Sequence, residues 1–249
     1  MLTFASNTIL AMKKCLNCGN DCYDRFCPKC GQSTATGRTT WRSFSLTSLL
    51  EMLRFQGRNL HTCGELLLHP WTVIANYTAG RRVRYSSPLL FLLTLAILGT
   101  LLSSWAGLED NDDRSSYLLR FHSFSSGMFT VCMLPPAILS LRIVYRKYGI
   151  KRYNTPELLI AGIYLSALSF LIDIILLPFD AWIIDTSGTN FTIFLVYCSV
   201  CVFKAFPIRP LWKAELRFIW FVILTGLFLG IYILALEEIT KLILGPIIE

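Results

Sequence analysis

Apolar residues are concentrated in five long stretches beyond residue 87, with short polar segments between them. A helix needs about 20 mostly apolar residues to cross the hydrocarbon core of a bilayer. The stretches predict transmembrane helices over residues 88–105, 127–145, 158–178, 191–206 and 218–236. We therefore expect an all-α membrane bundle of about five helices in a domain over 88–237, followed by a tail over 238–249.

Two polar interruptions occur within these stretches. Pro135 and Pro136 lie in the second stretch and predict a kink, because proline lacks the backbone N–H that a helix uses. Asp173 lies in the third stretch. An ionisable residue at membrane depth is a candidate for function, because a charge in the hydrocarbon core costs free energy. Two interpretations stay open: Asp173 reaches the outer headgroups near Pro178, or it forms an intramembrane polar site.

Charge alternates between successive loops. Basic residues precede the first stretch and separate the second from the third and the fourth from the fifth: Arg81, Arg82, Arg84, Arg146, Lys147, Lys151, Arg152, Lys204, Arg209, Lys213 and Arg217. Acidic residues dominate the other two loops: Glu109, Asp110, Asp112, Asp113, Asp180 and Asp185. Since Lys and Arg collect in cytoplasmic loops, we expect a multi-pass protein of the inner (plasma) membrane, with a cytoplasmic N-terminus and an external C-terminus.

Composition agrees with a membrane protein. The chain has 249 residues, 54% of them hydrophobic, and a mean hydropathy of +0.54. Charged residues make up 16%, against about 25% in soluble domains. The lipid bilayer is thus the first expected partner. The net charge of +7 is explained by the cytoplasmic loops and needs no nucleic acid.

Residues 35–87 form an amphipathic linker between the N-terminal cysteines and the first stretch. Apolar residues recur at helical spacing over 46–55, and a second helical pattern over 60–77 is broken by Pro70. These helices are too short to span a bilayer. They fit either the inner membrane interface or a helical pair packed on the N-terminal segment. After them, Arg81, Arg82, Arg84 and Tyr85 are predicted to anchor the chain at the headgroups.

A repeated C-x-x-C-G pattern marks residues 13–34 as a zinc ribbon. Cys15 with Cys18, and Cys27 with Cys30, supply two pairs of thiolates, which is the ligand set of a tetrahedral structural zinc site. Gly19 and Gly31 follow the pairs, where we expect a positive φ that turns amide groups toward the sulfur atoms. A segment this short has no core of its own, so the metal must supply about 10 kcal/mol of folding free energy.

Two alternatives concern the same site. A rubredoxin-like iron site uses the same pairs, although the short insert between them favours zinc. Cys22 lies between the pairs and is expected to be a bystander. Because four thiolates leave no open coordination position, the site is predicted to be structural and not catalytic.

Catalytic motifs are missing from the sequence, so we expect no enzyme. His61 and Glu65 have the i, i+4 spacing of a hydrogen bond on one helix face. The ribbon has no dense basic stripe, which disfavours nucleic acid and favours a protein partner or the chain's own membrane body. We expect a docking, regulatory or sensing module, and the alternative is a transporter or channel-like body with a regulatory ribbon. The oligomeric state, and a start at Met1 or Met12, stay open.

Three segments together resemble a family of uncharacterised bacterial membrane proteins with an unknown function. They are Cys15 to Gln32 (C-L-N-C-G, then F-C-P-K-C-G-Q), Leu66 to Trp71 (L-L-L-H-P-W) and Tyr77 to Pro88 (Y-T-A-G-R-R-V-R-Y-S-S-P). The segment from Gly80 to Pro88 is the most specific of the three, and Trp71 departs from the family pattern after the proline. The resemblance implies an N-terminal ribbon followed by several spans, and it implies no reaction.

Overall fold

A computed structural model gives the structure of the chain over residues 13–37, 58–105, 134–148, 150–182, 187–206 and 208–248. Several predictions fall outside these residues. They are the helix over 46–55, the acidic residues from Glu109 to Asp113, the beginning of the second stretch before 134, and the choice of start between Met1 and Met12.

The N-terminal segment is a small ribbon. Strand β1 (Lys13–Lys14) pairs antiparallel with β2 (Asp21–Cys22), with Lys13 opposite Cys22 and Lys14 opposite Asp21. A single further bridge joins Phe26 to Ser33 among the described residues. The buried residues of this ribbon are mainly cysteines, so its fold depends on the four sulfur atoms and not on an apolar core.

Two short helices follow. Helix α2 (Arg58–Leu68) ends before His69, and α3 (Pro70–Thr78) begins with proline, whose missing N–H is tolerated in the first turn. The predicted break at Pro70 is confirmed. Both helices pack on α8 (Thr155–Trp182), which places Leu66 and Tyr77 in the main apolar core.

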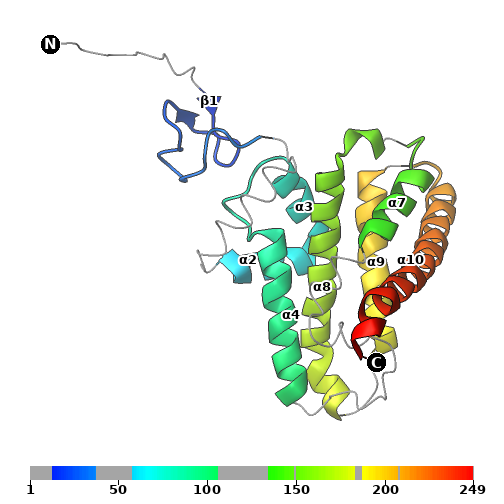
Figure 1. Cartoon of the computed structure of the whole chain (residues 1–249). Helices are drawn as coiled ribbons and strands as arrows, with labels where there is room; N and C mark the ends of the chain where they lie inside the picture. The colour runs from blue at the N-terminus through cyan, green and yellow to red at the C-terminus, as the bar shows by residue number, and fades with distance from the viewer. Residues whose placement is uncertain are drawn as a thin grey trace.

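The remaining helices form a bundle around α8 (Figure 1). They are α4 (Pro88–Trp105), α7 (Leu134–Val144), α9 (Ser187–Ala205) and α10 (Leu211–Ile248), with a short 3₁₀ helix η1 (Ile150–Arg152) before α8. Helix α8 packs against α4, α9, α3 and α7, whereas α10 lies at the edge against α7. An outward row of large apolar side chains on α10 fits contact with lipid.

Three of the described helices are long and apolar enough to cross a membrane: Pro88–Trp105, Thr155–Phe179 and Leu211–Leu236. Two shorter apolar segments, Leu134–Val144 and Thr192–Ala205, lie among them. The helical bundle is therefore confirmed, and three of the predicted segments are helices long and apolar enough to span a membrane. The structure leaves the total number of spans open. The first predicted span and α4 have the same bounds.

Helices α8 and α10 extend beyond the spans predicted for them. Helix α8 continues through Pro178 to Trp182, so this proline does not end it. Helix α10 begins at Leu211 and runs to Ile248, so the segment predicted as a tail is helical to that residue. Apolar runs mark the part of a helix that suits lipid, and the hydrogen-bonded helix extends beyond that part at both ends.

Candidate metal centre

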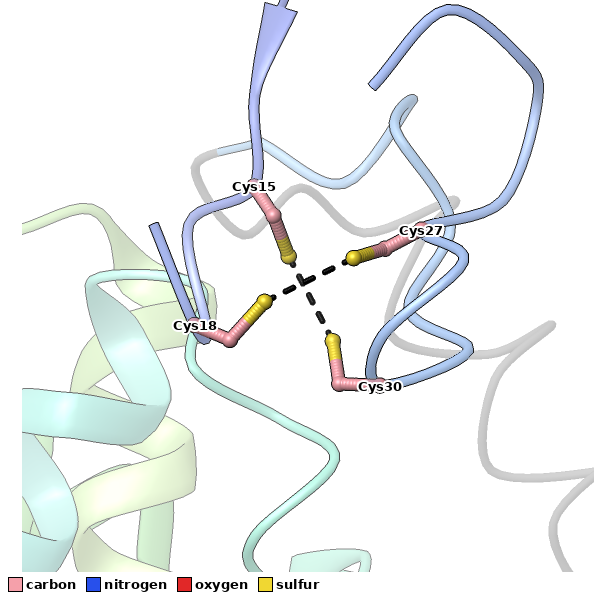
Figure 2. A group of neighbouring side chains, drawn as sticks. All are labelled: Cys15, Cys18, Cys27 and Cys30. Carbon is pink, nitrogen blue, oxygen red and sulfur yellow. Dashed lines mark hydrogen bonds between the residues drawn. The ribbon is translucent and has the colours of Figure 1, made fainter. Parts of the chain in front are cut away.

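Four cysteine sulfur atoms lie together in the ribbon. The Sγ atoms of Cys15, Cys18, Cys27 and Cys30 all lie within 4.8 Å of one another. Cys15 Sγ is 3.5 Å from Cys30 Sγ, and Cys18 Sγ is 3.5 Å from Cys27 Sγ. Figure 2 shows all four side chains pointing at a common centre. A tetrahedral site with metal–sulfur distances of about 2.3 Å has sulfur atoms about 3.8 Å apart, so the set fits a metal ion.

Two turns of the same kind hold these sulfur atoms. The backbone N–H of Gly19 donates to the carbonyl of Cys15 at 2.9 Å, and that of Gly31 donates to Cys27 at 2.8 Å. Gly19 and Gly31 have φ of 74° and 72°, as predicted, and a side chain at either position would be strained. Each C-x-x-C-G sequence therefore closes one turn that presents two thiols to the same point.

The surroundings of the thiols lower the pKa of Cys27 and raise that of Cys18. Burial raises the pKa of Cys27, but the N–H groups of Cys30 and Lys29 outweigh burial and lower this pKa to about 6. At Cys18, the N–H of Asn20 lowers the pKa, while burial and the neighbouring thiols raise it to about 12. An ionised Cys27 thus opposes the ionisation of Cys18. A divalent cation removes this repulsion, which is the general reason that metal binding releases protons from such sites.

Cys22 is close to the cluster but is not part of it. Its Sγ atom donates to the carbonyl of Asn20 at 3.4 Å, and the side chain is buried. Burial and the nearby Cys27 raise the pKa of Cys22 to about 11, so it stays a protonated thiol. Cys22 therefore forms a hydrogen bond to the backbone and is not expected to bind the metal.

The ribbon is joined to the bundle by Gln32. The Nε2 atom of Gln32 donates to the carbonyl of Gly80 at 2.8 Å, and its Oε1 atom accepts the N–H of Arg82 at 3.3 Å. The side chain is buried, and its own carbonyl accepts the N–H of Cys27 at 2.8 Å. One residue therefore contacts both a metal-ligand turn and the loop before α4.

Gly80 and Arg82 complete this junction. Gly80 has a φ of 98°, and a Cβ atom there would lie 2.9 Å from Leu16 of the ribbon. Arg82 is 8% exposed, and its Nη2 atom donates to the carbonyl of Gly37 at 3.0 Å. This role of Gln32 was not predicted from the sequence, although the residue directly follows the second C-x-x-C-G.

A polar network holds α2 against the same loop. Tyr85 donates from its hydroxyl to Glu65 Oε2 at 2.7 Å, and Asn76 donates to the Tyr85 hydroxyl at 3.0 Å. The Oε1 atom of Glu65 lies 3.3 Å from His61 Nε2 and also accepts from Arg84. The predicted contact between His61 and Glu65 on one helix face is confirmed. Burial raises the pKa of Glu65, but the bonds from Tyr85 and Arg84 lower it overall.

The four predicted membrane anchors have different surroundings. Arg81 and Arg84 are exposed, while Arg82 and Tyr85 are buried against protein. Of these four side chains, only the exposed Arg81 and Arg84 are able to reach lipid headgroups. The anchoring role of Arg81 and Arg84 stays a prediction, and the structure gives Arg82 and Tyr85 roles in joining the ribbon and α2 to α4.

Asp173 lies on an exposed face of α8, and neither it nor the proline pair lines the main cavity of the bundle. Pro135 and Pro136 are at the beginning of α7 as described, so the predicted kink lies outside the described residues. The structure thus does not bring Asp173 together with the prolines.

Comparison with known proteins gives one partial match. Residues 57–99 match a family described as "Protein of unknown function (DUF3667)". No match was found among curated proteins or among solved structures. The matched region contains α2, α3, the loop with Gly80 and Arg82, and the first turns of α4. The comparison supports an uncharacterised family over this region, and the ribbon lies outside the match.

Proposed function

We propose that this chain is a multi-pass membrane protein in which a zinc-bound ribbon acts as a regulatory or sensing head for the helix bundle. The hydrogen bonds of Gln32 to Gly80 and Arg82 carry this proposal. They connect a turn that holds Cys27 with the loop that leads into α4. Loss of the metal would unfold the turn and release this loop, so that metal occupancy sets the position of the first membrane helix.

Zinc is the proposed metal because four thiolates at tetrahedral spacing and a short insert suit it, and no open position is left for catalysis. A structural site without a catalytic set also supports a non-enzymatic role. The exposed rings of Tyr23 and Phe26 on the ribbon give a protein partner an apolar surface. The bacterial family proposed from the sequence has the same order of ribbon and spans.

The proposal includes five spans in the inner membrane with the ribbon in the cytoplasm. The alternating directions of the helices support the order of the crossings. Helices α4, α8 and α10 begin at the end of the bundle nearest the ribbon, and α7 and α9 end there (Figure 1). The three basic loops of the sequence therefore gather at one end. A cytoplasmic position for that end agrees with the positive-inside rule and leaves the C-terminus outside.

No specific observation in the described residues favours the transporter alternative. Its two candidate elements were Asp173 and the proline pair, and in the described part of the chain neither lines the cavity between the helices. We therefore retain only the regulatory proposal.

Hydrogen exchange of the full chain in detergent tests the proposal. In the wild type, chelation of the metal should increase exchange in the peptide that contains Arg82. Its N–H then loses Gln32 as an acceptor and keeps only the carbonyl of Gly80. A Gln32→Ala variant should keep its zinc but show fast exchange at Arg82 with or without metal. An Arg25→Gln variant, changed at an exposed ribbon site, is the control. Equal protection of the Arg82 peptide with and without metal in the wild type would contradict the proposal.

A further inference from the structure

A large cavity, partly open to the surroundings, lies between α3, α7, α8, α9 and α10. Its volume is about 830 Å³, which lies within the range of small-molecule pockets. Its walls are largely apolar side chains, among them Ile74, Leu141, Leu165, Phe194, Phe221 and Leu229. Thr225 also lines it, but its hydroxyl donates to Phe221 of its own helix at 2.7 Å. The wall therefore suits an apolar occupant.

The cavity runs lengthwise from the ribbon end of the bundle. On α9 it is lined from Ala205 at that end to Phe194, which is about 17 Å at 1.5 Å per residue. On α8 it is lined from Glu157 to Ser166. One leaflet of a bilayer has a hydrocarbon depth of about 15 Å, half of the ~30 Å core. The depth of the cavity thus equals about one leaflet.

Polar groups are placed at one end of this cavity. Thr78, Arg152, Tyr153 and Glu157 line the ribbon end, where Glu157 accepts the N–H of Asn154 at 2.9 Å and so caps α8. Glu157 also brings a negative charge to this end. Arg152 is exposed there, and with Arg146, Lys147 and Lys151 of the same loop it leaves a net positive charge. An anionic group with an apolar chain attached would place its charge at this end and its chain among the apolar side chains.

We propose that this cavity binds one phospholipid with an anionic headgroup from the leaflet on the ribbon side. One of its acyl chains lies between α8, α9 and α10, and its headgroup lies beside Arg152. Lipid is the solvent that surrounds these helices, and the match of depth, apolar wall and cationic end selects it over a water-soluble ligand. The alternative occupant is the segment over 106–133 of this chain, which the test distinguishes.

Photocrosslinking tests this inference on the full chain reconstituted in phosphatidylcholine vesicles. The probe is phosphatidylglycerol with a photoactivatable acyl chain, and adducts are mapped by mass spectrometry. We expect adducts on cavity residues such as Leu165 and Phe194. Adducts confined to outward residues of α10, such as Ile223 and Leu227, would overturn the proposal and would also be the result if 106–133 fills the cavity.

Cavity-filling variants make the test specific. Ala137→Phe and Ala161→Phe, tested separately, place a ring in the cavity and should each lower the cavity adducts several-fold. Ala235→Phe on the exposed face of α10 should leave them unchanged. Unchanged adducts in both filling variants would overturn the proposal, and the wild-type map remains decisive should either variant fail to fold.

The headgroup is tested with a phosphatidylcholine probe that carries the same chain. The wild type should crosslink phosphatidylglycerol more strongly, and Arg152→Gln should reduce that preference by about five-fold, the effect of one basic side chain near an anionic headgroup. Equal crosslinking of both probes by the wild type would overturn the assignment of an anionic headgroup.

Discussion

The guanidinium of Arg82 lies over the ring of Tyr77, with its Cζ atom 5.7 Å from the ring centroid. Tyr77 in turn meets the ring of Tyr164 edge-on at 5.5 Å, and the Tyr164 hydroxyl donates to the carbonyl of Ser86 at 2.6 Å. These contacts connect the loop beneath the ribbon with the central helix α8. The side chain that binds Gly37 of the ribbon is therefore also packed on the membrane bundle.

This relationship predicts that Arg82→Gln weakens the attachment of the ribbon. The variant removes a charge-assisted hydrogen bond to Gly37 and a cation–π contact, which together contribute on the order of 2 kcal/mol. The measurement is the rate of proteolysis of the ribbon in the full chain, which should rise. Arg81→Gln, at an exposed neighbour, should leave the rate unchanged. Equal rates in the two variants would show that the attachment does not depend on Arg82.

Gly80→Ala should have a similar effect for a different reason. A side chain at a φ of 98° is strained, and its Cβ atom would lie 2.9 Å from Leu16. The backbone term alone costs about 1–2 kcal/mol. We expect faster hydrogen exchange in the Arg82 peptide and a lower thermal unfolding temperature. Gly37→Ala is the matched control, since its Cβ would meet nothing within 4 Å, and it should be close to neutral.

The Glu65 network predicts a pH-dependent stability. Hydrogen bonds from Tyr85 and Arg84 lower the pKa of Glu65 in the folded chain. A group with a lowered pKa contributes stability above its unfolded pKa, about 4.3, and loses it as the pH falls through the folded value. Wild type should therefore exceed Glu65→Gln in thermal stability at pH 7, and the difference should shrink below about pH 4. A difference that grows on acidification would contradict this account.

The orientation in the membrane is tested by labelling from one side. A cysteine introduced at Arg146, in the basic loop before α8, should react with an impermeant maleimide only after the inner membrane is opened. A reporter of periplasmic location fused after Glu249 should be active in intact cells, because five spans place that end outside. Activity of the same fusion only in the cytoplasm would contradict the five-span arrangement.

Features set by local sequence were predictable. Pro70 separates α2 from α3 because its ring and missing N–H act within the preceding helical turn. Gly19 and Gly31 take a positive φ because each closes a turn of a few residues. The bounds of α4 were predictable because the run from Pro88 to Trp105 begins with proline, is mostly apolar and has no charged residue.

Features set by contacts distant in sequence were not predictable. Gln32 and Gly80 are 48 positions apart, and neither residue type reveals the other as its partner. Tyr85 was assigned to headgroups because a tyrosine near arginines is typical of a membrane interface. The structure instead buries it, since Glu65 and Asn76 on two other helices supply partners for its hydroxyl.

The metal content of the purified full chain tests the central claim most directly, because the ribbon and its junction both depend on the four thiolates. The account predicts one zinc ion per chain, retained in Cys22→Ser and Cys63→Ser and lost in Cys30→Ser. A wild-type chain that contains no stoichiometric metal, or a Cys30→Ser variant that keeps it, would contradict the account.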